Sequence, residues 1–489
     1  MTVTAPGNAT ETEFETVIGL EVHVQLKTNS KLFDAAPNVF GDEPNVNIHT
    51  PCLGLPGALP VLNEQAVEFA IQLGLALNCK IAPVTKFDRK QYFYPDLPKG
   101  YQISQYDYPI CEHGSMTLSN GRDVRILRAH LEEDAGKLVH AGSVGLAGAE
   151  YSLVDLNRAG APLVEIVSEP DIRTAEEARE YVQQIRNIVR YLGVCDGNLD
   201  EGSMRCDANV SIRPVGSSEY GTKAEIKNMN SFRSIQRAIE SEVARQTEIV
   251  RSGGRVVQES RLWDEATQST RTMRSKEDAH DYRYFPDPDL RPIPIPAEKV
   301  AKLKETLPEL PAQRYERLVN GFGMSEYDAS VMVEFKEMGD FFELAAAHNP
   351  NYKSLTNWIQ GDITAYLKNN KLSIFETKLS PDALAELVHL VDASTISSAM
   401  AKKLIPELLE KGGKPEALVK EKGMSQITDP SALKAIIEKV LVANPDNVAA
   451  YKGGKDKLFG FFVGQVMKES KGSANPELIN ELLKEMLAQ

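Results

Sequence analysis

Five short segments of the chain alternate apolar and polar residues, which is the pattern of strands with one buried face. In the clearest segment, 204–213, the apolar residues alternate with Arg205, Asp207, Asn209, Ser211 and Arg213. The other four are 17–26, 129–134, 162–167 and 223–227. Between residues 16 and 288 these segments are separated by glycine, proline, asparagine and aspartate, so the pattern predicts a large domain built on a β-sheet.

Two stretches of the same region have the period of amphipathic helices. Thr174 and Glu177 form the pattern of a capping box, and apolar residues follow at helical spacing until Gly193. The segment 231–250 has a similar pattern and ends shortly before a pair of glycines. Strands and helices in one domain of this kind predict the α+β fold class.

The rest of the chain is predicted to be helical. Seven prolines between residues 285 and 311 disfavour a continuous helix and predict an extended connector. Beyond it, Ser380, Pro381 and Asp382 open a helical segment, and Gly412–Gly413 indicates a break before a final module. At roughly 150 residues per domain, the 489 residues are enough for three domains. We predict a sheet domain over 1–296, a helical domain over 297–411 and a helical tail module over 412–489.

The composition is that of an ordinary globular protein, with 42% apolar and 25% charged residues. No apolar run approaches the roughly 20 residues of a membrane-spanning helix, and the polar residues 1–15 do not resemble a signal peptide. The five cysteines are odd in number and widely spaced, so neither a disulfide framework nor a zinc ribbon is predicted. These features predict a cytoplasmic protein with no membrane partner.

The net charge of −14 bears on possible nucleic-acid partners. A surface of this sign repels polyanions, so binding to DNA or RNA through overall charge is excluded. Any contact with nucleic acid therefore depends on a local basic patch.

The polar faces of the predicted strands carry an unusual set of residues. Aspartate and asparagine are depleted in strands, yet these faces combine them with glutamate, histidine and arginine. If the strands are neighbours, oxygen ligands with one imidazole suit Mg²⁺ or Mn²⁺, and nearby cations suit phosphate, as in phosphoryl transfer. The alternative is an ordinary solvated sheet face. The candidate ligands are Glu21, His23, Glu132, Glu165 and Asp207, with Arg205, Lys223 and Lys227 as anion partners.

Common nucleotide-binding motifs are absent from the sequence. Neither GxxxxGK[ST] nor GxGxxG occurs, which argues against a P-loop and against a dinucleotide site. The spacing of Gly142, Gly145 and Gly148 is typical of a hairpin tip. The segment Asp281–Pro286 is rich in tyrosine and arginine, which can stack on bases and pair with phosphate, or pack as a domain edge.

Six longer motifs occur in the order in which one known family has them. They are ETVIGLEVHVQL at 15–26, CLGLPGALP at 52–60, FYPDLPKGY at 93–101, HLEEDAGK at 130–137, EGSMRCDANV at 201–210 and DYRYFP at 281–286. In these motifs, and over nearly its whole length, the chain resembles the B subunit of the aspartyl/glutamyl-tRNA amidotransferase.

The resemblance implies a heterotrimer with an amidase A subunit and a small C subunit. Its substrates are misacylated tRNAs, Glu-tRNA(Gln) and Asp-tRNA(Asn). With ATP and Mg²⁺ as cofactors, the side-chain carboxylate is phosphorylated, and ammonia released from glutamine displaces the phosphate. The sheet domain would be the cradle of this family. Two alternatives stay open: a subunit that only positions tRNA, and a separate ammonia ligase acting on a small carboxylic acid.

The resemblance also implies roles for individual residues. Glu21, His23, Glu132, Glu165 and Asp207 match the metal-binding floor, and Glu132 is preferred to Glu133 because it shares the face of His130. Contacts with phosphate or substrate during catalysis are expected from Arg158, Arg205, Lys223 and Lys227, and ATP contacts from Lys137, Asn209 and Arg283. In the tail, Lys452, Lys455 and Lys457 form either a tRNA-contacting turn or a solvated helix end.

Overall fold

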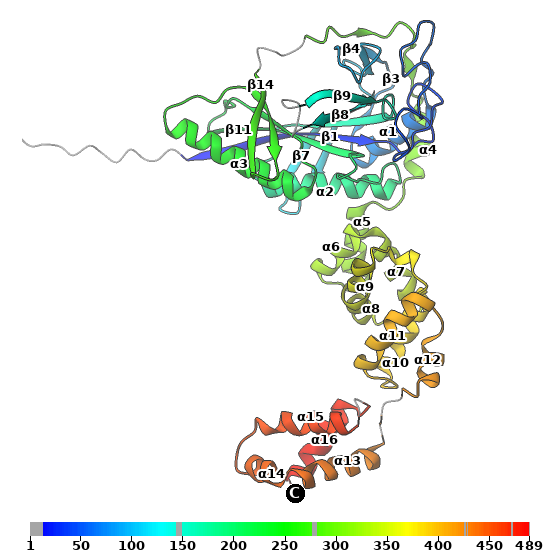
Figure 1. Ribbon diagram of the computed structural model, residues 1–489, viewed down its shortest axis with the longest axis vertical. Helices are drawn as coiled ribbons and strands as arrows, with labels where there is room; N and C mark the ends of the chain where they lie inside the picture. Colours follow the sequence, from blue (N-terminus) through cyan, green and yellow to red (C-terminus); the bar gives the residue numbers. More distant parts are fainter. Residues whose placement is uncertain are drawn as a thin grey trace, which may run out of the picture. The chain divides into compact units, whose positions relative to one another are not determined.

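The computed structural model describes residues 13–142, 149–275, 281–424, 427, 429–470 and 473–488. The chain forms two compact units, Met1–Pro311 and Ala312–Gln489 (Figure 1). None of the helices in the described ranges is long and apolar enough to cross a membrane.

The first unit is built on a nine-stranded sheet with the order β14-β13-β12-β11-β1-β10-β7-β6-β2. All pairs within it are antiparallel except β12–β13. The strands are β1 (Phe14–Gln25), β2 (Lys80–Ile81), β6 (Cys111–Thr117), β7 (Asp123–Glu133), β10 (Pro162–Ser168), β11 (Met204–Pro214), β12 (Ala224–Lys227), β13 (Glu259–Asp264) and β14 (Ser269–Ser275). All five segments predicted from alternation are strands of this sheet.

Helices α1 (Glu64–Ala76), α2 (Ala175–Leu192) and α3 (Phe232–Arg251) cover one face of the sheet (Figure 1). The apolar residues of β1, such as Val22 and Val24, are fully buried in the core between this face and the helices. As predicted, α2 begins with a capping box of Thr174 and Glu177, and Gly193 ends it in the left-handed conformation with φ 72°. The polar residues of the alternating strands therefore lie on the opposite face.

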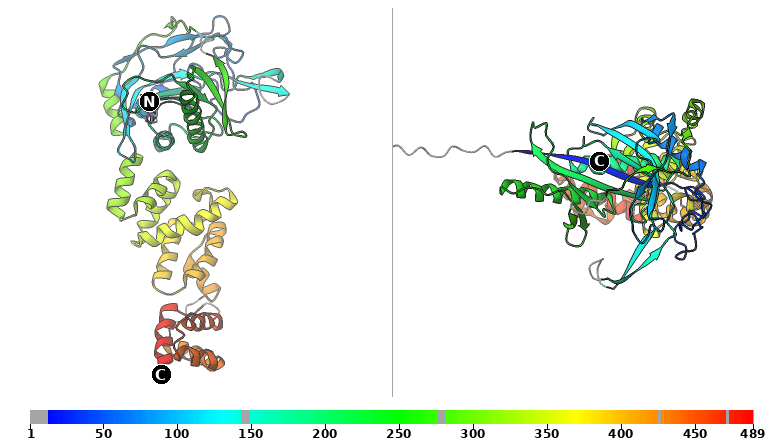
Figure 2. Two further views of the ribbon diagram at one scale, coloured as in Figure 1. Left: turned by 90° about the vertical axis from the view of Figure 1, so that its left-hand side faces the viewer. Right: turned by 90° about the horizontal axis from the view of Figure 1, so that it is seen from above.

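Smaller sheets border the polar face. Strand β4 lies between β5 and β15, and β3 pairs with β16. The hairpin of β8 and β9 projects from the body of the unit (Figure 2); of the predicted tip glycines, Gly145 and Gly148 lie outside the described residues. The bounds are β3 (Val84–Thr85), β4 (Asp88–Gln91), β5 (Tyr101–Ser104), β8 (Lys137–Gly142), β9 (Ala149–Asp155), β15 (Phe285–Pro286) and β16 (Ile293–Pro294).

The proline-rich segment differs from the predicted extended connector. It contributes β15 and β16 to the small sheets and then forms helix α4 (Ala297–Glu305), which packs on α1 and pairs Lys299 with Glu64 at 2.9 Å. The first unit therefore extends beyond the predicted boundary at 296. Five of the seven prolines precede the helix, Pro308 and Pro311 follow it, and none lies within 297–305, where proline would interrupt it.

In its described parts the second unit is built from helices, as predicted, with one isolated β-bridge between Ile427 and Ala474. Helix α10 begins at the predicted cap Ser380, and α11 and α12 are separated by the predicted break at Gly412–Gly413. Its helices are α5 (Pro311–Phe322), α6 (Glu326–Glu334), α7 (Lys336–Ala346), α8 (Tyr352–Trp358), η3 (Ile359–Ile363), α9 (Thr364–Asn370), η4 (Ile374–Glu376), α10 (Pro381–Asp392), α11 (Ser398–Lys411), α12 (Pro415–Glu421), α13 (Pro430–Ala443), α14 (Pro445–Lys452), α15 (Leu458–Glu469) and α16 (Pro476–Ala488).

The last four helices share a hydrophobic cluster that includes Leu433, Phe462 and Leu483. Helix α12 instead packs on α10 and α11, and Lys422 pairs with Glu407 at 2.8 Å. The division between the two groups of helices therefore follows α12, whereas the glycine pair had predicted it at 411/412.

Candidate functional site

Strand β1 brings the polar residues of four strands together. His23 lies opposite Glu165 of β10 on one side and opposite Arg205 of β11 on the other. Glu165 in turn lies opposite His130 of β7. Residues directly opposite one another share a face of the sheet, so the strands whose polar faces were predicted to form one floor are neighbours.

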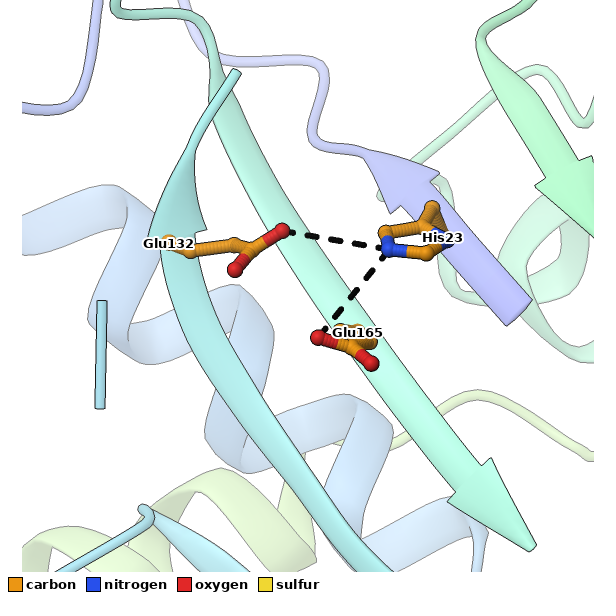
Figure 3. A group of neighbouring side chains, drawn as sticks. All are labelled: His23, Glu132 and Glu165. Atoms are coloured by element: carbon orange, nitrogen blue, oxygen red, sulfur yellow. Dashed lines mark ion pairs between the residues drawn. The ribbon is translucent and has the colours of Figure 1, made fainter. Parts of the chain in front are cut away.

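The first acidic group on this floor consists of His23, Glu132 and Glu165 (Figure 3). The His23 Nε2 atom lies 3.9 Å from Glu132 Oε1 and 4.0 Å from Glu165 Oε2. These separations are too long for hydrogen bonds, but one ion about 2.1 Å from each ligand atom spans them. Glu132 is buried and also accepts a hydrogen bond from the Ser104 hydroxyl at 3.1 Å.

The buried His130 lies next to this group and stabilises the negative charge of its two carboxylates. Its Nε2 atom is 3.2 Å from Glu165 Oε2 and 3.7 Å from Glu132 Oε2. Burial alone would raise the pKa of Glu165, but His130, His23 and Lys90 outweigh it and hold this pKa well below its usual range. Burial would likewise raise the pKa of Glu132, and His130 again lowers it. Both carboxylates are therefore ionised at neutral pH.

The second acidic group consists of Glu21, Asp207 and Glu225. Glu21 lies opposite Asp207 in the β1–β11 register, and Glu225 comes from β12, the next strand along. Lys227 Nζ binds Asp207 Oδ2 at 2.6 Å and Glu225 Oε1 at 2.8 Å. Asn209 donates a hydrogen bond to Glu21 Oε1 at 2.9 Å.

The second acidic group has more negative than positive charge, because its three carboxylates face one ammonium group, that of Lys227. The pKa of Glu21 is raised, first by burial and then by the carboxylates of Glu165, Glu225 and Asp207, and Lys227 compensates only in part. Three carboxylates and one ammonium group leave positive charge to be supplied. A divalent ion would supply that charge, so the donor set fits Mg²⁺ or Mn²⁺.

Two predicted arginines meet at one carboxylate beside the floor. Arg205 Nη2 donates to Asp134 Oδ2 at 2.8 Å, and Arg158 Nε lies 3.5 Å from the same oxygen. Arg158 also donates to the carbonyls of Ala135 and Gly136. A third of each arginine side chain stays exposed, so both guanidinium groups are held in place with free donors for an anion.

Glu133 points away from the floor, although it is adjacent to Glu132. Its carboxylate pairs with Lys99 and accepts the backbone N–H of Ile103 at 2.9 Å. Glu132 and not Glu133 therefore lies with His130 and His23, and its role as a metal ligand stays a prediction.

The remaining predicted residues lie outside the two acidic groups. Lys223 precedes β12 and is exposed, and Lys137 is exposed at the start of β8. Arg283 is exposed near β15. Sequence reasoning missed Glu225 as a ligand, because the lysines on both sides of it in alternation indicated a strand that binds anions. It also left out Asp134, which follows directly on β7.

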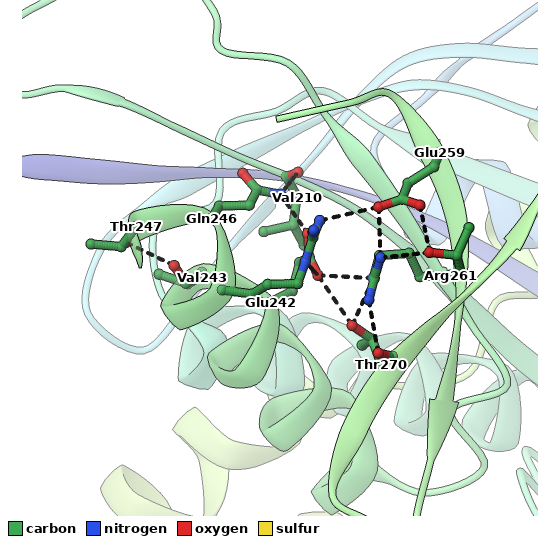
Figure 4. A network of polar contacts seen from close by, with 10 residues as sticks. Val210, Glu242, Val243, Gln246, Thr247, Glu259, Arg261 and Thr270 are labelled. Atoms are coloured by element: carbon green, nitrogen blue, oxygen red, sulfur yellow. Dashed lines mark hydrogen bonds and ion pairs between the residues drawn. The ribbon is translucent and has the colours of Figure 1, made fainter. Parts of the chain in front are cut away.

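Strand β13 pairs with β12 and orients the Glu225 carboxylate. Ser260 donates a hydrogen bond to Glu225 Oε2 at 2.6 Å. The next residue, Arg261, belongs to a buried network on α3 and β14, in which it lies 3.4 Å from Glu242 and 2.6 Å from Glu259 (Figure 4). This network holds β13, and with it Ser260, against the second acidic group.

Comparison with known proteins gives a consistent result over the whole chain. Residues 16–301 match the family model described as the GatB/GatE catalytic domain, and residues 340–487 match the GatB domain. The chain is 56% identical to a protein of Thermosynechococcus vestitus, over 99% of this chain and 98% of that protein. It is 54% identical to a protein of Trichodesmium erythraeum over the full length of both. Both relatives are named as the B subunit of an aspartyl/glutamyl-tRNA(Asn/Gln) amidotransferase.

Proposed function

The chain belongs to the GatB/GatE family of tRNA amidotransferase B subunits, and we propose that the acidic face of its sheet activates and amidates the amino acid carried by tRNA. As a member of this family it is a subunit of a multi-subunit, tRNA-dependent amidotransferase. The observation that carries the proposal is the pair of acidic groups side by side on one sheet face, with Lys227 and Arg205 beside them.

The proposed reaction has two steps. A side-chain carboxylate oxygen of Glu-tRNA(Gln) or Asp-tRNA(Asn) attacks the γ-phosphorus of ATP, and ADP leaves. Ammonia then attacks the acyl carbon, loses a proton, and inorganic phosphate leaves the amide. In this proposal an amidase A subunit releases the ammonia from glutamine, a small C subunit completes the heterotrimer, and the reaction takes place in the cytoplasm.

Two divalent ions fit the floor. His23, Glu132 and Glu165 would hold one, and Glu21, Asp207 and Glu225 the other. Bound there, Mg²⁺ would neutralise the oxygens of a phosphoryl group and polarise them.

The basic residues orient and neutralise the anionic substrates in this proposal. Lys227 is fixed between Asp207 and Glu225, so its remaining N–H donor is positioned at the edge of the second group. Arg205 and Arg158 are held by Asp134 and present donors for phosphate oxygens. Asn209 fixes the rotamer of Glu21. Lys223, Lys137 and Arg283 stay predicted contacts with the substrates.

The neighbouring Glu132 and Glu133 provide a matched test of the site. We expect Glu132→Gln to lower ATP hydrolysis dependent on charged tRNA by about 10–100-fold in the assembled complex, since a ligand loses its charge while its shape is kept. We expect Glu133→Gln to leave this rate per folded molecule unchanged. It should instead lower the free energy of unfolding by about 1–3 kcal/mol, because Lys99 loses its partner.

The same pair of variants separates the proposal from its main alternative. If the chain only positions tRNA while other subunits perform the chemistry, Glu132→Gln should bind charged tRNA and consume ATP as the wild type does. Equal losses of activity in both variants would contradict the assignment of Glu132 to the floor.

Ser260 gives a prediction about metal affinity that does not depend on turnover. We expect Ser260→Ala to weaken Mn²⁺ binding by roughly 10-fold, because Glu225 loses the hydrogen bond that orients its carboxylate. Titration of the complex with Mn²⁺, followed by electron paramagnetic resonance of the free ion, measures this. Ser260→Thr keeps the hydroxyl and should bind as the wild type does; unchanged affinity in Ser260→Ala would mean that Glu225 is not a ligand.

A further inference from the structure

Four tyrosines form a continuous aromatic cluster in the segments that adjoin the strands of the small sheet of β4, β5 and β15. The rings of Tyr106 and Tyr284 are stacked, with centroids 4.3 Å apart and planes 12° apart. Tyr282 lies edge-on to Tyr284 at 6.1 Å, and Tyr92 lies edge-on to Tyr282 at 6.0 Å. Tyr106 has 51% of its surface exposed, so the cluster reaches the protein surface.

Backbone pairing and one side-chain hydrogen bond link this tyrosine cluster to the first acidic group. Gln91, at the end of β4, donates its N–H to the carbonyl of Tyr282 at 3.0 Å. Strand β4 pairs along its length with β5, and the last residue of β5, Ser104, donates to Glu132. Burial raises the pKa of Tyr284; the charge of Lys90 lowers this pKa, and the charges of Glu132 and Glu165 raise it, which agrees with this proximity.

An arginine stands between two of the tyrosines. Arg283 has a φ of +45°, which an L-residue rarely adopts, and the side chain of Gln91 donates to its carbonyl at 3.3 Å. The Arg283 side chain is 81% exposed, and its ion pair with the exposed Asp281 is long, at 3.8 Å. The strained backbone therefore displays a guanidinium with free donors next to the rings.

We propose that Tyr106, Tyr282, Tyr284 and Arg283 bind an adenosine, namely the 3′-terminal adenosine of the charged tRNA. Every tRNA ends in this nucleoside, and its ribose carries the amino acid. A side-chain carboxylate seated at the acidic floor thus lies only a few bonds from that ribose. An unpaired base adds to an open aromatic stack, and the Arg283 guanidinium pairs with a backbone phosphate of the acceptor end.

This inference rests on the proposed function, because the terminal adenosine carries the amino acid whose side-chain carboxylate the floor is proposed to receive. The other source of the same chemistry is the adenosine of ATP. If the cluster binds the adenosine of tRNA, its loss weakens tRNA binding. If it binds the adenosine of ATP, its loss raises the KM for ATP.

The test compares uncharged tRNA with the same tRNA lacking its terminal adenosine. Dissociation constants are measured by filter binding to the assembled complex, without ATP or glutamine. We expect the wild type to bind the shortened tRNA about 10-fold or more weakly, the range for one stacked base. Tyr284→Leu should bind both tRNAs equally, whereas Tyr284→Phe keeps the ring and should discriminate as the wild type does.

Arg283→Gln, on an exposed side chain, tests the phosphate contact independently of folding. We expect the slope of log Kd against log salt concentration to become shallower by about 0.7, the value for one phosphate of a single strand. Tyr108→Leu is the control for Tyr284→Leu, since it removes a tyrosine ring that lies outside the cluster; it should change neither discrimination nor slope.

Two results would overturn the inference: equal binding of the two tRNAs by the wild type, or full discrimination by Tyr284→Leu. If Tyr284→Leu keeps its tRNA discrimination and its KM for ATP rises, the adenosine is that of ATP. Failure of the proposed function is distinguishable: the tRNA discrimination would persist, but the wild-type complex would consume no ATP with charged tRNA.

Discussion

Asp207→Ala is expected to lower both ATP hydrolysis dependent on charged tRNA and the yield of amidated tRNA by at least about 100-fold. Loss of one preorganised electrostatic group at a reacting centre typically reduces kcat by roughly 10²–10³-fold. Asp207 combines two such roles, because it belongs to the second acidic group and also fixes Lys227 at 2.6 Å. Without it, Lys227 keeps only its contact with Glu225 and no longer stands where a phosphoryl oxygen would need it.

The experiment uses the reconstituted complex at fixed Mg²⁺ and salt concentrations. Glutaminase activity of the complex and binding of charged tRNA should stay at wild-type values. Glutamine is hydrolysed in the proposed A subunit, and Asp207 does not belong to the cluster proposed to bind the tRNA end. Glu219→Ala is the matched control, because it removes an exposed carboxylate from the loop after β11 with the same change of charge. Normal ATP turnover in Asp207→Ala would show that the acidic face is a solvated sheet surface.

Local pattern was sufficient to predict five strands of the main sheet and the face that carries the candidate site. Period-two alternation identified β1, β7, β10, β11 and β12, since one side of each is buried against helices. Helix starts could also be predicted from local sequence, because a cap such as Thr174 needs only the residues that follow it.

The order of the strands could not be predicted in this way. His23 meets Glu165 and Arg205 across gaps of more than a hundred residues, and nothing in either segment specifies the partner. The split of the candidate ligands into two groups depends on this order. The lysines that alternate with Glu225 hid its role, and only the place of β12 next to β11 joins it to Asp207.

The proline-rich segment shows how a composition signal can mislead. Proline density predicted extended chain up to Pro311, but the effect of proline is positional. Pro296 occupies the cap of α4, and the nine residues 297–305 contain no proline to interrupt the helix. Packing on α1 then stabilises it.

Glu242→Ala is expected to lower the free energy of unfolding of the first unit by about 3–5 kcal/mol, the range for breaking a buried ion pair from one side. Glu242 is fully buried on α3. Its carboxylate binds Arg245 at 2.6 Å, accepts a hydrogen bond from Gln246 at 2.8 Å and lies 3.4 Å from Arg261 (Figure 4). Alanine would leave the buried Arg261 with Glu259 alone as its charge partner at this position.

Trp263 reports on this change directly, because it lies on β13, two residues after Arg261, and is buried. The chain has two tryptophans, so in a Trp358→Phe background the fluorescence during urea unfolding follows β13 alone. Glu248→Ala, on the exposed side of the same helix, should stay within about 0.5 kcal/mol of its parent. If Glu242→Ala unfolds at the urea concentration of its parent, the network does not hold β13. If it is destabilised as expected, the same variant should also bind Mn²⁺ more weakly, because β13 carries the Ser260 hydroxyl that orients Glu225.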